Sequence, residues 1–289
     1  MKKFQNILAL LRVRHYIKNL FVYIPLFFMG KDFSVQSFWN CCMGFAAFSL
    51  TASIVYTIND IKDLENDRLH PTKKNRPLAS GSVSKFEGLL CAAFCLLSSV
   101  IISIILIVEQ KVPLYSCGYL SLYFVLNILY SLGLKNFPIV DIIILMSGFL
   151  IRVMYGAVIA QTFVSSWLYL TVISGAFYLG LGKRRGELRG NTADKTRKVL
   201  KSYNMGFLDK FMYMCLTMAV VFYSLWAKEY SKEQVIWTVP IVIVICMQYS
   251  LNVEGNSDGD PVEVVLKDKK LIVLCFLLFA VLISIIYLV

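Results

Sequence analysis

Apolar segments long enough to cross a membrane recur from one end of this 289-residue chain to the other. A transmembrane helix needs about 20 predominantly apolar residues to span a hydrocarbon core of about 30 Å. Nine segments meet this condition: residues 20–36, 39–58, 87–108, 112–131, 139–160, 164–182, 211–227, 234–251 and 271–289. Hydrophobic residues make up 58% of the chain and charged residues 16%, which excludes an ordinary soluble domain. The sequence therefore predicts an all-α fold, a polytopic integral membrane helical bundle of about nine transmembrane helices.

The basic residues are distributed unevenly between the loops. A net charge of +11 would suggest a nucleic-acid partner in a soluble protein, but here 24 lysines and arginines fall before the first span or in alternate loops, against 4 in the remaining loops. Positive charge accumulates on the cytoplasmic side of membrane proteins. We therefore expect no nucleic acid, a multi-pass protein of the inner (plasma) membrane, a cytoplasmic N-terminus and, with nine spans, a C-terminus outside.

The hydrophilic segments are too short to form a soluble domain. The longest ones, 61–86 and 183–210, have under about 30 residues each, too few for a core of their own. We expect a single transmembrane domain over residues 1–289, with cytoplasmic motif loops at 59–86 and 183–210. The eight cysteines lie in or beside apolar spans and are interpreted as buried thiols.

An acidic stretch follows the second span. With about 100° per residue on a helix, four oxygen-bearing side chains share one quadrant: Asn59, Asp60, Asp63 and Asp67. Lys62 and Glu65 point away from this quadrant. Converging carboxylates repel each other unless a cation lies between them, and Mg²⁺ is commonly bound by one or two carboxylates together with substrate phosphates. The spacing therefore predicts a Mg²⁺ site, and the bases Lys73 and Arg76 that follow can reach phosphate oxygens.

Three motifs carry a resemblance to a known family. The stretch NDIKDLENDRLHPTKKNRPLASG (59–81) resembles the first aspartate-rich motif of the UbiA-type polyprenyl transferase superfamily. With RVRHYIKN (12–19) and YSLGLKNFPIVD (130–141), the chain most resembles the branch that transfers phosphoribosyl to decaprenyl phosphate. The resemblance extends over about residues 8 to 270.

This resemblance implies a fold, a reaction and a site. The expected fold is UbiA-like, and the expected reaction is Mg²⁺-dependent transfer of 5-phosphoribosyl from phosphoribosyl diphosphate to a polyprenyl phosphate lipid, in cell-envelope precursor synthesis. The expected catalytic carboxylates are Asp60, Asp63 and Asp67, which hold Mg²⁺ with Asn59. Lys18, Asn19 and Lys135 join the expected substrate-binding residues because they stand in the matching motifs.

Two charged residues lie within the fifth predicted span. Asp141 and Arg152 are eleven residues apart, about 16 Å along a regular helix, so they cannot pair directly. An arginine at mid-span costs at least a few kcal/mol unless it faces protein or a water-filled cavity. We expect Arg152 to face the site and bind substrate; the alternative is a structural ion pair with an acid on another helix.

The sixth span ends in LGKRRGELRG (181–190). Lys183, Arg184 and Glu187 are candidates for substrate binding here. Aromatic prenyltransferases of the superfamily carry a second aspartate-rich motif at this point, but residues 183–210 contain only the isolated Asp194 and Asp209. A basic segment suits a donor with more phosphate, which favours phosphoribosyl transfer. Tyrosines near the cytoplasmic edge, Tyr203 among them, are interpreted as interfacial belt residues without a chemical role.

Two other functions remain open from the sequence. One is transfer of a polyprenyl group from its diphosphate to an aromatic acceptor. The other is a membrane transporter, in which Asp141 and Arg152 would line a path but the acidic face would have no purpose. The sequence leaves a homo-oligomer open as well.

Overall fold

The computed structural model describes residues 2–70, 73–189, 198–230, 232–255 and 261–288. Asp194 and parts of both predicted motif loops lie outside these ranges. The described residues form helices and no strands, which confirms the all-α prediction. The chain divides into two compact units: unit 1 comprises Met1–Phe27, Phe33–Leu132 and Ile151–Thr162, and unit 2 comprises Phe28–Asp32, Gly133–Leu150 and Phe163–Val289.

Within the described part of the chain, six helical segments are long and apolar enough to cross a membrane. They are α3 (Val35–Lys62), α5 (Lys85–Val108), α7 (Val140–Ala160), α10 (Met205–Glu229) and two composite segments. Glu233–Glu254 comprises η6 (Glu233–Thr238) and α11 (Val239–Glu254), and Lys269–Leu288 comprises α13 (Lys269–Ile283) and η7 (Ser284–Leu288). The apolar helix α6 (Ser116–Leu132) is shorter, and α8 (Ser166–Arg189) has 24 residues. The protein is an integral membrane protein, and the number nine is not confirmed.

The first predicted span, residues 20–36, is not a continuous helix. It is divided between the end of a 3-10 helix η1 (Val13–Tyr23), a single turn α2 (Ile24–Phe27) and a second 3-10 turn η2 (Gly30–Asp32). Pro25 has no backbone N–H and is tolerated in a helix only in its first turn, so a new helix begins there. Gly30 has a φ of 57°, which ends the helical path.

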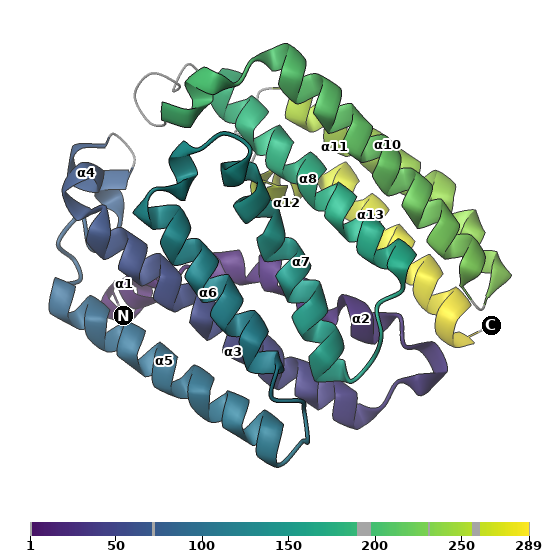
Figure 1. Ribbon diagram of the computed structural model, residues 1–289, viewed down its shortest axis with the longest axis horizontal. Coiled ribbons are helices and arrows are strands. Elements are labelled where there is room, and N and C mark those ends of the chain that lie inside the picture. The colour runs from purple at the N-terminus through teal and green to yellow at the C-terminus, as the bar shows by residue number, and fades with distance from the viewer. Residues whose placement is uncertain (1, 71–72, 190–197, 231, 256–260, 289) are drawn as a thin grey trace. The chain divides into compact units, whose positions relative to one another are not determined.

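In unit 1, α3 and α5 pack along their length and run side by side (Figure 1). Ser34 caps the start of α3, and a capping box of Ser84 and Glu87 starts α5. The hydroxyls of Thr51 and Ser99 lie 3.0 Å apart and join the two helices within the apolar layer. Such hydroxyl bonds between helices satisfy polar groups that lipid cannot solvate.

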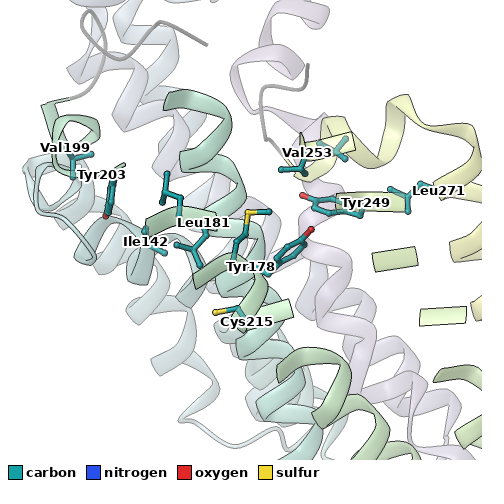
Figure 2. Packing of buried hydrophobic residues seen from close by; sticks show 12 residues of the cluster. Ile142, Tyr178, Leu181, Val199, Tyr203, Cys215, Tyr249, Val253 and Leu271 are labelled. Carbon is teal, nitrogen blue, oxygen red and sulfur yellow. The ribbon is translucent and has the colours of Figure 1, made fainter. Parts of the chain in front are cut away.

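In unit 2, the core lies between α8, α10 and α11 and includes the turn η5 (Lys198–Ser202). Figure 2 shows Tyr178 and Leu181 of α8 close to Cys215 of α10, with Tyr203 beside Val199. The short helix α12 (Pro261–Lys267) contributes Val264 to the same cluster. This packing holds the end of α8, up to Arg189, against η5.

Candidate functional site

The predicted acidic face lies where α3 ends. α3 stops at Lys62, Asp63 has φ −88° and ψ 9°, and a short helix α4 (Leu64–Leu69) follows. The expectation of one regular helix over 59–67 is therefore wrong at Asp63, because the chain bends there to bury Leu64 in a cluster with Leu10. Helical hydrogen bonds nevertheless continue through the bend, from Asp63 N to Asn59 O and from Asp67 N to Asp63 O.

Asp60 and Asp67 converge on one guanidinium. Both carboxylates are buried, and Nη1 of Arg76 donates to Asp60 Oδ1 at 3.0 Å and to Asp67 Oδ2 at 2.6 Å. The sequence did not single out Arg12, whose Nη2 donates to Asp60 Oδ1 at 2.6 Å and whose guanidinium lies over the Tyr56 ring. Arg12 has a φ of 53°, a conformation that no sequence pattern indicates. The two buried acids are thus neutralised by Arg12 and Arg76, which lie on opposite sides of them in the sequence.

Asn59, Asp63 and Lys73 lie in the same part of unit 1 as Asp60 and Asp67. Asn59 Oδ1 accepts a hydrogen bond from Ser131 Oγ at 2.6 Å, which orients the amide. Asp63 is half-buried at the bend. Lys73 Nζ lies 4.0 Å from Asp67.

The donor set of this cluster fits a hard divalent cation in its chemistry, because carboxylate and amide oxygens are the ligands Mg²⁺ prefers. Among the residues the structure describes, however, no three His, Cys, Asp or Glu side chains are grouped closely enough to hold a metal ion. The predicted metal ligands therefore stay a prediction.

Arg152 is buried in unit 1, as the cost of a mid-span arginine requires. Its Nε donates to Asn19 Oδ1 at 2.7 Å, and its Nη2 donates to Tyr123 OH at 3.3 Å. The guanidinium lies 4.8 Å from the Phe48 ring centre and 4.9 Å from that of Tyr123, within cation–π range. Asn19 is equally buried and donates to Ser49 Oγ at 2.9 Å.

A second cluster lies in unit 2 around Arg184. This arginine and Asp141 have no exposed side-chain surface, and Arg184 Nε donates to Asp141 Oδ2 at 2.5 Å. Arg184 Nη1 donates to Glu187 Oε2 at 2.5 Å. Lys183 is half-buried beside them on α8, and Lys135 is half-buried in the turn η4 (Leu134–Asn136).

The interpretation of Tyr203 as an interfacial belt residue is wrong. Its side chain is buried, and its hydroxyl donates to Asp141 Oδ1 at 2.5 Å while accepting from Ile139 N at 2.6 Å. Burial first, and then the hydrogen bond to Asp141, raises the pKa of the Tyr203 hydroxyl, which keeps it a neutral donor. Ile139 has a φ of 69°, a strained conformation for a β-branched residue.

The expected residues are thus divided between the units. Unit 1 contains nine of them: Lys18, Asn19, Asn59, Asp60, Asp63, Asp67, Lys73, Arg76 and Arg152. Unit 2 contains the other four: Lys135, Lys183, Arg184 and Glu187. Asp209, which stood isolated in the sequence, pairs with Arg185 at 2.5 Å. Asp141 and Tyr203 were missed as site residues because the contacts form between distant parts of the sequence. Arg184 and Tyr203, which bond to Asp141, lie 43 and 62 residues from it.

The apolar helices and their buried charged clusters define a helical integral membrane protein. The family model described as UbiA prenyltransferase family matches residues 20–184. The chain belongs to this family of transferases.

Curated relatives and solved structures agree with this membership. The decaprenyl-phosphate phosphoribosyltransferase of Mycolicibacterium smegmatis is 32% identical over 93% of this chain and 88% of its own length. The protein of the same name from Corynebacterium glutamicum is 33% identical over 91% of this chain and 81% of its own length. Among solved structures, a UbiA homolog from Archaeoglobus fulgidus bound to GPP and Mg²⁺ has a TM-score of 0.73 at 18% identity, covering 97% of this chain and 99% of that one.

Proposed function

We propose that this protein transfers the 5-phosphoribosyl group of phosphoribosyl diphosphate to a polyprenyl monophosphate and releases diphosphate. The single observation that carries the proposal is its similarity, over more than nine tenths of the chain, to two enzymes named decaprenyl-phosphate phosphoribosyltransferase. The substrates are then phosphoribosyl diphosphate and a lipid phosphate within the membrane. The product would enter cell-envelope glycolipid synthesis.

The charged clusters support this reaction chemically. The donor carries a diphosphate and a 5-phosphate, and the acceptor carries a third phosphate-type group, so the substrates bring many negative charges together. In unit 1, Lys18, Lys73 and Arg76 are suited to bind phosphate, and in unit 2 Lys135 and Lys183 are. Asp141 and Glu187 accept hydrogen bonds from Arg184 and fix its orientation, so its guanidinium would present a positive charge in a defined position. Guanidinium groups suit phosphate because they donate two parallel hydrogen bonds.

In the proposed reaction, the bond from ribose C1 to the diphosphate oxygen breaks while a phosphate oxygen of the lipid bonds to C1. The diphosphate leaves with the electron pair, and the ribose carbon passes through an oxocarbenium-like state. The attacking oxygen is already anionic, so no side chain needs to remove a proton. Arg76 and Arg12 then serve to bind and orient phosphate at the acidic cluster.

Mg²⁺ would be held by Asn59, Asp60, Asp63 and Asp67. When bound, it would neutralise the negative charge that develops on the departing diphosphate. The A. fulgidus homologs bound to GPP and to DMAPP also contain Mg²⁺, which supports use of a divalent metal here.

A radiolabel assay tests the proposal. Purified detergent-solubilised protein, Mg²⁺, phosphoribosyl diphosphate labelled in the ribose and a polyprenyl phosphate are incubated, and the organic phase is counted. We expect label in the lipid phase, and its loss when EDTA is present. If the protein is folded and no label enters the lipid phase, the proposed function is contradicted.

The second candidate is transfer of a polyprenyl group to an aromatic acceptor. It is favoured by the ligands of the solved relatives, because GPP and DMAPP are prenyl diphosphates. Parallel tubes with polyprenyl diphosphate and 4-hydroxybenzoate test it. A prenylated aromatic, without ribose label in lipid, would select this candidate.

We also propose that the chain works as one domain in the inner (plasma) membrane, with its N-terminus in the cytoplasm and its C-terminus outside. The uneven distribution of lysine and arginine supports this orientation. A homo-oligomer is compatible with it and is tested by the mass of the detergent-solubilised particle.

A further inference from the structure

The segment that carries Lys18 is an unusually long 3-10 helix. η1 has 11 residues, whereas 3-10 helices rarely extend beyond about four. In this geometry side chains three residues apart lie above one another. The buried face follows this period, with Asn19 and Val22 buried and Tyr16 partly buried, while Ile17 and Leu20 are exposed.

The buried face of η1 pairs with one stripe of α3. Tyr16 OH lies 2.8 Å from Ser53 Oγ, and Asn19 Nδ2 donates to Ser49 Oγ at 2.9 Å. The two serines are four residues apart on α3, whereas their partners are three apart on η1. Four α-helical residues rise about 6 Å, and three 3-10 residues rise about 6 Å as well. The 3-10 winding therefore matches the spacing of the serines, which three α-helical residues, rising about 4.5 Å, would not.

The same segment is fixed to α7 at two points one helical turn apart. Arg152 Nε donates to Asn19 Oδ1 at 2.7 Å. Four residues later, a Cβ at Gly156 would lie 2.0 Å from the carbonyl oxygen of Val22, so the backbones touch there. Both the oxygen and the nitrogen of the Asn19 amide are thus bonded to protein, and the residue is 1% exposed.

We propose that Asn19, Ser49 and Arg152 form a clamp that fixes η1 in 3-10 geometry and thereby sets the position of Lys18 for the donor phosphate. Asn19 is then a positioning residue that acts through its neighbour. Lys18 directly precedes Asn19 on η1 and is half-buried. This inference rests on the proposed function for its kinetic readout only.

The kinetic test uses the purified full chain with Ser49→Ala, Lys18→Met and the double variant. Ser49→Ala removes the hydroxyl that accepts the hydrogen bond from Asn19. We expect it to raise KM for phosphoribosyl diphosphate about 3- to 10-fold with kcat changed less than about twofold. In the Lys18→Met background the same change should alter KM less than about twofold. Ser49→Thr, which keeps the hydroxyl, should restore most of the wild-type KM.

Ser103→Ala is the matched control, because among the described residues the Ser103 hydroxyl bonds to the Ser99 carbonyl of its own helix. It should leave KM within about twofold of wild type. Equal KM increases by Ser49→Ala with and without Lys18, or no increase at all, would overturn the positioning role.

A stability cycle tests the clamp independently of activity. Asn19→Ala and Ser49→Ala should each lower the Tm, and the double variant should lower it no further than the larger single effect, because both break one connection. Additive shifts would overturn the clamp. If wild type shows no phosphoribosyl transfer while the Tm shifts are non-additive, the proposed function fails and the clamp stands.

Discussion

A fully buried guanidinium needs negatively charged partners. Arg184 has two, the carboxylates of Asp141 and Glu187. Losing one partner of a buried pair costs about 3–5 kcal/mol, because the other charge is left without compensation. Asp141 is in turn oriented by the hydroxyl of Tyr203. The geometry of the Asp141–Arg184 pair therefore depends on an uncharged residue, Tyr203.

Tyr203→Phe should lower the stability of the protein by about 1–3 kcal/mol, because the buried Asp141 loses a donor and the N–H of Ile139 loses an acceptor. Thermal unfolding in detergent measures this as a lower Tm. Tyr119→Phe is the matched control, because the hydroxyl of Tyr119 on α6 makes no hydrogen bond within the described part of the chain. Equal Tm values for the two variants would contradict the structural role of Tyr203.

Asp63→Asn should reduce phosphoribosyl transfer about 100-fold or more and raise the Mg²⁺ concentration needed for half-maximal rate. The reason is that an amide keeps the size of the side chain but removes one unit of negative charge from the proposed metal ligands. Glu65→Gln is the control, because Glu65 is exposed and pairs with Arg68 on its own helix. Wild-type Mg²⁺ dependence in Asp63→Asn would remove Asp63 from the metal site.

Helices in this protein approach each other most closely where glycine permits it. A Cβ at Gly156 would overlap the carbonyl of Val22 at 2.0 Å, and a backbone atom cannot move aside as a side chain can. Gly156→Ala should therefore destabilise the protein by about 1–3 kcal/mol or more. Gly118→Ala in α6 is the control, because no other described part of the chain lies within 4 Å of its Cβ position. A Tm for Gly156→Ala at or above that of Gly118→Ala would contradict the close contact.

α11 and α13 are joined at one carboxylate. Asp268 Oδ2 accepts from Gln248 and Asn252 at 2.6 Å each, and Oδ1 caps α13 by accepting from the N–H of Lys270. Led by the bond from Asn252, these hydrogen bonds lower the pKa of Asp268 to about 2. Its usual value is 3.8.

The lowered pKa gives a pH prediction for Asp268. A depressed carboxylate pKa contributes stability that is complete above pH about 4 and is lost as pH falls toward about 2. Thermal unfolding of wild type and Asp268→Ala at pH 7 should differ by a few degrees (about 2–4 °C). The difference should shrink between pH about 4 and 2. A difference that is the same at both ends of this range would contradict the assignment.

The sequence predicted the helices better than the contacts between them. Apolar length alone indicated α3, α5 and α7, because spanning a bilayer requires helices and a minimum length. The winding of η1 could not be predicted, since 3-10 geometry there matches serines on another helix. Helical spacing brought Asp60 and Asp67 together correctly, but the bend at Asp63 depends on burying Leu64, which periodicity does not show.

At the scale of the whole molecule, each unit buries its own set of charges in an apolar surrounding. Unit 1 buries Asp60 and Arg152, and unit 2 buries Asp141 and Arg184. Buried charge is expensive in a membrane and is usually functional. Because the proposed donor, phosphoribosyl diphosphate, is water-soluble, the proposed orientation places the motif loops in the cytoplasm.

Whether the broken segment of residues 13–32 crosses the membrane decides whether the number of crossings is odd or even. If six spans, α6, α8 and this segment all cross, the C-terminus lies outside; if the broken segment only enters and returns, the C-terminus lies in the cytoplasm. Fusions of alkaline phosphatase, active outside, and a fluorescent protein, active inside, after residues 84, 111, 203 and 289 distinguish these cases. We expect fluorescence at 84 and 203 and phosphatase activity at 111 and 289. With a cytoplasmic N-terminus, phosphatase activity at 84 and 203 together with fluorescence at 111 and 289 would mean one crossing fewer before every fusion point and would show that the segment broken at Pro25 does not span the membrane.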